Sequence, residues 1–181
     1  MNLEGKHILD VTCGSRSIWF QKECKCAVYC DKRTLEDEPI WKSTKNDSVR
    51  KISVKPDIIC DFTNLPFPDN SFELAVFDPP HMQSLTENAW MAKKYGVLPK
   101  DESVWKPMIH DGFTECMRVL KPFGTLIFKW NETEIPTREV IKAIGTEPLF
   151  GHKSGKKSLT HWMCFMKIED STSLPPSRRR N

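Results

Sequence analysis

The sequence predicts a single-domain α/β protein built on a mainly parallel sheet of seven strands with helices on both faces. Short, nearly all-apolar runs alternate along the chain with helical or irregular connections, which is the pattern of a parallel sheet covered on both sides. The length of 181 residues, of which 39% are hydrophobic, suffices for one sizeable core and is short for two. We therefore expect one domain over residues 1–168.

Acidic residues lie within or directly after the first four predicted strands. The apolar runs span residues 7–13, 27–30, 57–60 and 74–77, and the carboxylates are Asp10 within the first run and Asp31, Asp61 and Asp78 directly after the others. The first run leads through Gly14 into apolar clustering at 17–20, which predicts a strand, a turn and a helix. Ligands of parallel sheets bind at the carboxyl ends of strands, so we expect these carboxylates to face one site.

The rest of the chain predicts one long helix, one short helix and three more strands. We expect a turn at 65–72 and a long helix at 104–120, which ends at residues 121–124. A strand at 125–130, a short helix near 137–144 and strands near 146–150 and 160–167 should follow. Proline and Asp-Asn pairs define the turn, and apolar residues on one helical face define the long helix.

Two regions do not fit this simple alternation. Residues 32–56 are polar, charged and weakly periodic, and residues 81–103 form a connection too long for an ordinary turn. The second region interleaves Trp90 and Tyr95 with lysines, as a surface that stacks bases and contacts phosphates would. We expect both regions to contribute to substrate binding, and a basic loop at 151–157 is a further candidate for backbone contact.

We expect a cytoplasmic protein. The net charge is +3, no apolar stretch approaches the roughly 20 residues of a membrane span, and the N-terminus lacks the layout of a signal peptide. The end of the chain, 169–181, is polar, proline-containing and basic, so we expect a disordered tail. Charge permits a nucleic acid partner without requiring one.

The seven cysteines are expected to be reduced thiols. Their number is odd and most lie in apolar runs, unlike a disulfide framework. Cys24, Cys26 and Cys30 suggest zinc, but they form no CxxC pair and no histidine lies close beside them. We interpret them as packing residues and predict no metal site.

A nucleotide-like ligand would suit the first two strand ends. Gly14 allows backbone N–H groups and a helix N-terminus to approach a polar ligand closely. Asp31 follows that turn at the place where a carboxylate accepts hydrogen bonds from ribose hydroxyls. Asp61 is placed either to accept a hydrogen bond from an adenine amino group, with Phe62 covering the ring, or to cap its own turn.

The segment Asp78-Pro79-Pro80-His81 is the most specific signal. Two prolines remove two backbone donors and stiffen the segment, which leaves the Asp78 carboxylate and the Pro79 carbonyl as fixed acceptors. Two such acceptors would orient an amino group for attack on a methyl group, so that catalysis comes largely from positioning. His81 is planar and suited to stacking on the ring that carries the amine.

Four motifs together resemble the class I S-adenosylmethionine-dependent methyltransferases, which have a three-layer Rossmann-like fold. Residues 10–15 resemble their first motif, 121–126 the step before their fifth strand and 65–72 a segment that recurs in the class. Residues 78–81 resemble the DPPY-type motif of amino methyltransferases that act on adenine, cytosine or guanine. The resemblance covers about residues 6–167, and the set is similar to small methyltransferases encoded by phages and prophages.

The resemblance implies an S-adenosyl-L-methionine cofactor and a nucleic acid substrate, with adenine favoured. It assigns cofactor contacts to Asp10, Thr12, Cys13, Gly14, Asp31, Asp61, Phe62 and Asp78, and acceptor contacts to Asp78, Pro79, Pro80 and His81. This sequence has fewer glycines in the first motif, His81 stands where an aromatic residue is usual, and 181 residues hold no separate recognition domain. A small enzyme of this kind favours bases that are already accessible, because flipping a paired base costs roughly a few kcal/mol.

Two other functions stay open at this point. One is methylation of a protein amide or a small amine, and the other is a non-catalytic protein that binds S-adenosylmethionine, such as a phage effector. The Asp78 carboxylate favours a base over an amide, and mere cofactor binding would not need the acceptor array at 78–81.

Overall fold

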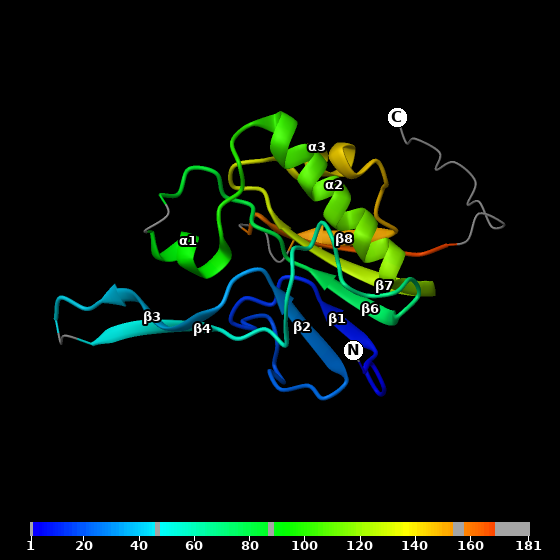
Figure 1. Cartoon of the computed structure of the whole chain (residues 1–181). Coiled ribbons are helices and arrows are strands. Elements are labelled where there is room, and N and C mark those ends of the chain that lie inside the picture. Colours follow the sequence, from blue (N-terminus) through cyan, green and yellow to red (C-terminus); the bar gives the residue numbers. More distant parts are fainter. Residues whose placement is uncertain (1, 46–47, 87–88, 154–157, 169–181) are drawn as a thin grey trace.

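The protein contains a seven-stranded, mainly parallel sheet, as predicted (Figure 1). The computed structural model describes residues 2–45, 48–86, 89–153 and 158–168. In spatial order the strands are β5 (Ile58–Ile59), β2 (Ala27–Asp31), β1 (Ile8–Asp10), β6 (Phe72–Phe77), β7 (Leu120–Asn131), β9 (Thr160–Met166) and β8 (Phe150–Lys153). The first five are parallel, and β9 runs antiparallel to both β7 and β8.

One face of the sheet carries the main hydrophobic core under two helices. Helices α2 (Glu102–Val119) and α3 (Thr137–Ile144) contact each other and lie on the same face (Figure 1). Alternate residues of the strands, such as Leu9 and Val28, point into this core together with Ile109 of α2. Both helices lie close to their predicted bounds.

The other face is covered by turns where we expected a helix after the first strand. Residues 11–26 contain no helix, and Phe20 is fully exposed. Arg16, which has a positive φ of 53°, lies 3.7 Å above the Tyr29 ring and donates to the Lys22 and Lys55 carbonyls. Trp19 contacts Tyr29 from the side. These side chains close a small second core and hold the backbone in turns, which explains why the helix does not form.

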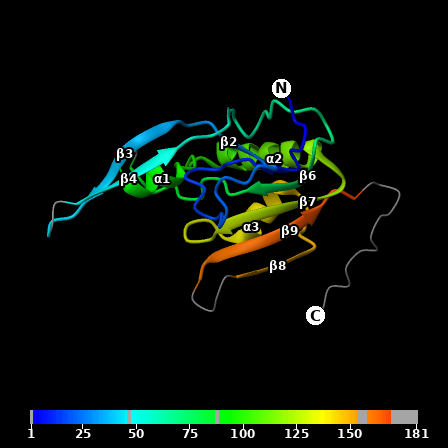
Figure 2. The same cartoon turned by 90° about the horizontal axis from the view of Figure 1, so that it is seen from below.

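The two regions that did not fit the alternation form one substructure beside the sheet. Residues 32–56 contain the antiparallel hairpin of β3 (Leu35–Lys42) and β4 (Val49–Val54), which projects from the body (Figures 1 and 2). The 81–103 connection contains α1 (Trp90–Tyr95), which lies against β3. Lys93 joins the two, with its Nζ 2.5 Å from Glu38 Oε1.

Two boundaries differ from the prediction. Residues 121–124, which we expected between the helix and the strand, lie inside β7, because the strand begins at Leu120. They bend the strand: Phe123 has a φ of 62°, and the register with β6 shifts there. Strand β8 begins at Phe150, four residues later than expected. The chain at 154–157 of the predicted basic loop and the tail at 169–181 lie outside the described residues.

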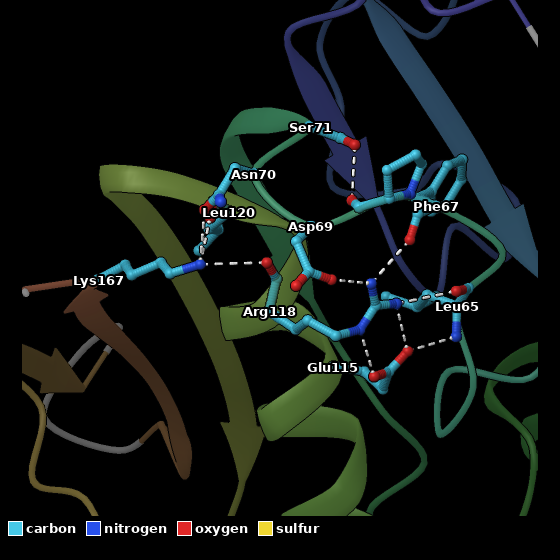
Figure 3. Close-up of polar contacts among 10 residues, drawn as sticks. Leu65, Phe67, Asp69, Asn70, Ser71, Glu115, Arg118, Leu120 and Lys167 are labelled. Atoms are coloured by element: carbon cyan, nitrogen blue, oxygen red, sulfur yellow. Dashed lines mark hydrogen bonds and ion pairs between the residues drawn. The ribbon is translucent and has the colours of Figure 1, made fainter.

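Arg118 fastens the predicted turn at 65–72 to the end of α2 (Figure 3). Its guanidinium donates to the carbonyls of Leu65 and Phe67 and to the carboxylates of Asp69 and Glu115. The Arg118 guanidinium holds the pKa of Glu115 below its usual range, and Glu115 accepts a further bond from the Leu65 N–H. The network fixes the chain just after Phe62, which lies against α2 at Gly112.

Within the described part of the chain, no helix has the length and apolar character needed to cross a membrane.

Candidate active site

A pocket opens at the carboxyl ends of β1, β2 and β6, where the sequence placed the site. Most of the predicted residues line it, namely Thr12, Cys13, Gly14, Asp31, Phe62, Asp78 and Pro80. Lys32, Arg33, Lys94 and Tyr95 are among the other residues of the wall. Asp10, Asp61, Pro79 and His81 are not part of the lining.

Asp78 lines this pocket, and one of its two carboxylate oxygens is buried and unpaired. Its Oδ2 lies 2.5 Å from Lys129 Nζ, and its backbone N–H donates to Thr12 Oγ1 at 2.9 Å. Its Oδ1 is buried and receives no hydrogen bond from any residue that the structure describes. The side chains of Asp78 and Lys129 are 10% and 15% exposed. An unpaired acceptor in such a place costs free energy, so it is suited to a ligand that donates a hydrogen bond.

Asp31 is buried beside Gly14 and already holds several donors. Its Oδ2 accepts from the Gly14 N–H at 3.0 Å and from Arg33 Nη2 at 3.1 Å. Its Oδ1 accepts from the Arg33 backbone N–H and from Arg33 Nε. A ribose at this carboxylate would therefore have to replace Arg33 as a donor.

Asp10 lies beneath the pocket rather than in its wall. Its carboxylate accepts from Trp19 Nε1 at 2.6 Å and from the Thr12 N–H at 3.2 Å. Burial, assisted by the nearby negative charges of Asp78 and Asp31, raises the pKa of Asp10 to about 7. Three carboxylates thus gather at the strand ends, and a cationic ligand would relieve their repulsion.

The structure places Asp61 outside the lining and Phe62 within it. Asp61 Oδ1 accepts from the Thr63 N–H at 3.0 Å and from the Thr63 hydroxyl at 2.9 Å, so the carboxylate caps its own turn. Phe62 is buried against Phe77, with ring centroids 5.1 Å apart. Phe62 is therefore the better placed of the two to contact an aromatic ligand.

His81 supports an aromatic residue instead of forming the wall itself. It is buried between Tyr95 and Trp130, with ring centroids 6.0 and 6.1 Å away, and its Nδ1 lies 3.4 Å from the Pro79 carbonyl. Burial lowers the pKa of His81, which favours the neutral ring. Tyr95 lines the pocket beside Pro80 and presents an aromatic ring there.

Sequence reasoning missed Arg33 and Trp19, and it singled out Lys129 as a residue that could touch the acceptor but not as the partner of Asp78. Arg33 binds Asp31, Lys129 binds Asp78 and Trp19 binds Asp10, and each partner lies far from its carboxylate in sequence or in an irregular segment. Lys129 had one signal, because it lies near the end of the predicted fifth strand and opens toward the edge that carries Asp78. Across the described residues, no group of three His, Cys, Asp or Glu side chains is arranged to hold a metal, and the seven cysteines are free.

Comparison with known proteins supports the architecture. The chain matches no family model and no curated protein. Solved structures resemble it over most of its length. An S-adenosylmethionine-dependent methyltransferase from Methanosarcina mazei is 14% identical, over 90% of this chain and 92% of that one, with a TM-score of 0.52. The PH0226 protein from Pyrococcus horikoshii is 16% identical, over 90% of this chain and 82% of that one, with a TM-score of 0.51, and an S-adenosylmethionine-dependent methyltransferase from Leishmania major is 14% identical, over 91% and 67%, with a TM-score of 0.50.

The chain has the class I methyltransferase fold. Its strand order, with β9 inserted antiparallel between β7 and β8, is typical of that fold. At these identities the likeness concerns the fold, and the chemistry has to be argued from the pocket.

Proposed function

We propose that the protein is an S-adenosylmethionine-dependent methyltransferase that acts on an exocyclic amino nitrogen of a nucleic acid base, with adenine favoured. The buried, unpaired Oδ1 of Asp78 at the pocket wall carries the proposal. An amine donates hydrogen bonds, and this oxygen is the acceptor that lacks one. A hydroxyl acceptor could also donate, but the resemblance of residues 78–81 to the motif of amino methyltransferases favours an amine.

The pocket has the chemistry that the cofactor needs. The Asp31 carboxylate lies in the wall for the ribose hydroxyls, and Phe62 offers an apolar surface to the adenine ring. Lys32 and Lys94 lie in the wall and are the cations proposed for the cofactor carboxylate. When bound, S-adenosylmethionine supplies an electrophilic methyl group.

The residues of this chain then act by positioning. Lys129 neutralises Oδ2 of Asp78 and holds the carboxylate so that Oδ1 accepts a hydrogen bond from the amine. This bond turns the nitrogen lone pair toward the methyl group. Tyr95, supported by His81, provides the ring on which the base stacks. After transfer the nitrogen gives up a proton, for which the Asp78 carboxylate is the proposed acceptor.

The test is transfer of a labelled methyl group from S-adenosylmethionine to pooled DNA, RNA and protein of a bacterial lysate. Nuclease digestion and mass analysis of the nucleosides are expected to find a methylated base. Asp78→Ala should abolish transfer and keep cofactor binding, measured by titration calorimetry. Asp111→Ala, an exposed carboxylate on α2, is the matched control and should keep both.

Three outcomes would contradict the proposal. Label found only in protein would favour amide methylation, and cofactor binding without any transfer would favour a non-catalytic protein. Full activity of Asp78→Ala would remove Asp78 from the reaction.

A further inference from the structure

A second hollow lies between the hairpin and α1, apart from the pocket at the strand ends. It measures about 260 Å³ and is lined by Ile40, Trp41, Arg50 and Trp90. Trp41 is 49% exposed and Trp90 47% exposed, and Arg50 Cζ lies 5.6 Å from the centroid of the Trp41 ring. We call these four residues the hairpin groove. Two half-exposed tryptophans beside a guanidinium are unusual on a protein surface unless they bind something.

Charge on the hairpin is divided along its length. The acidic residues near its base are engaged by partners: Glu36 by Lys55, Asp37 by Ser53 and Glu38 by Lys93. The outer part, residues 40–51, contains Lys42, Lys45, Arg50 and Lys51 and only one acidic residue, Asp47. The hairpin groove therefore lies in the positive part of the hairpin, which favours a phosphate-bearing ligand.

Helix α1 links the hairpin groove to the candidate active site. Its first residue, Trp90, lines the groove, and its last residue, Tyr95, lines the pocket. At 1.5 Å rise per residue these positions are about 7.5 Å apart along the helix axis. Arg33 ties the helix to the strand end, because its Nη1 donates to the Lys93 carbonyl while its Nε and Nη2 donate to Asp31. Five residues also turn about 140° around the helix, so one strand of nucleic acid would have to pass around α1 to contact both places.

We infer that the hairpin groove binds an unpaired base of a single nucleic acid strand, next to the base that is methylated. The base stacks on Trp41 and Trp90, and Arg50 contacts the adjoining phosphate. The inference rests on the proposed function, since the same strand enters the pocket. The substrate is then single-stranded or looped nucleic acid, because stacking on tryptophan needs a base whose face is free.

The experiment measures affinity for short single-stranded DNA and RNA oligonucleotides by fluorescence anisotropy, with no methyl transfer involved. Trp41→Ala and Trp90→Ala should each weaken binding about 5-fold or more, the effect of losing one base–aromatic stack. Trp41→Phe and Trp90→Phe should keep most of the affinity, which separates lost stacking from misfolding. Phe150→Ala is the control, because Phe150 is 68% exposed on β8 at the far edge of the sheet.

Salt dependence tests the role of Arg50. Arg50→Gln should reduce the slope of log affinity against log salt by about 0.7, the value for one phosphate contact on a single strand. Arg138→Gln, an exposed arginine on α3, should leave the slope unchanged.

The outcomes distinguish this inference from the proposed function. If the protein methylates a base and both Trp→Ala variants bind oligonucleotides as tightly as the wild type, the inference about the hairpin groove is wrong. The proposed function is unaffected by that result. Absence of oligonucleotide binding by the wild type overturns the inference about the groove, and methyl transfer to a base by the same protein would still support the proposed function. If the wild type sediments as a dimer and the Trp→Ala variants as monomers with unchanged oligonucleotide affinity, a second copy of the chain covers the groove and the inference fails.

Discussion

Replacing Lys129 by Met would leave the Asp78 carboxylate buried without a counter-ion. Lys129 Nζ is 2.5 Å from Asp78 Oδ2, both side chains are largely buried, and the other oxygen, Oδ1, already lacks a donor in the described residues. The methionine side chain keeps most of the apolar volume of lysine. The substitution therefore removes the charge and the hydrogen bond with little loss of packing.

The expected cost follows from the burial of the pair. Removing one partner of a buried ion pair costs about 3–5 kcal/mol, and the remaining exposure of these side chains argues for the lower end, about 3 kcal/mol. For a domain of this size each kcal/mol lowers Tm by about 2–4 °C, so we expect a fall of about 6–12 °C. Methyl transfer should fall by about 100-fold or more, because Asp78 Oδ1 is no longer held in place.

The assay is urea unfolding followed by tryptophan fluorescence, with Asp78→Asn and the double variant completing a mutant cycle. The double variant should recover at least about 1 kcal/mol relative to the sum of the two single changes. Lys106→Met, which removes a surface pair with Glu102 on α2, is the control and should cost less than about 0.5 kcal/mol. A Lys129→Met variant as stable as this control, or strict additivity in the cycle, would refute the reasoning.

Two further predictions concern the carboxylates behind the pocket. Because the pKa of Asp10 is raised from 3.8 to about 7, its protonated form is favoured in the folded protein, and its contribution to stability is full below pH 3.8 and is lost as the pH rises through 7. Between about pH 5 and pH 8 the free energy of unfolding of the wild type should fall by about 2–3 kcal/mol relative to Asp10→Asn, and parallel curves in denaturant titrations would contradict this. Arg33→Ala should lower stability by about 1–3 kcal/mol, because it removes donors from the buried Asp31, yet should tighten cofactor binding by freeing that carboxylate for the ribose. Weaker binding in calorimetry would instead show that Arg33 holds the cofactor, and Asp31→Ala should weaken binding in either case.

The sheet could be predicted from the sequence because its strands have a simple physical signature. Buried parallel strands are short and apolar, and polar residues begin where they leave the core, as at Asp31 and Asp78. The helix after Gly14 was predicted wrongly because apolar clustering at 17–20 was weighed without the side-chain contacts of Arg16. Those contacts join residues distant in sequence, such as Lys55, and no local pattern reveals them.

The candidate site was predictable at its strand ends and not in its loops. Thr12, Gly14, Asp31 and Asp78 meet because the carboxyl ends of neighbouring parallel strands lie at one edge of the sheet. Tyr95 was visible only as one of several aromatic and basic residues in a long connection. Its place at the pocket depends on how α1 lies against the hairpin, which the sequence does not reveal.

Because no helix directly follows Gly14, other groups have to bind the carboxylate of the cofactor. We expected a helix N-terminus after Gly14 to face a polar ligand tail, but turns occupy that place and the Gly14 N–H is bound to Asp31. The positive charge at the pocket comes instead from the side chains of Lys32, Arg33 and Lys94. Two of these lie in the segment before the hairpin and the third lies on α1, so the elements that supply the cations for the cofactor also form the hairpin groove. Binding of a nucleic acid strand in that groove would move or fix the same elements. We therefore expect cofactor affinity to rise when a single-stranded oligonucleotide is bound, and the two affinities to be coupled by the same factor in both directions.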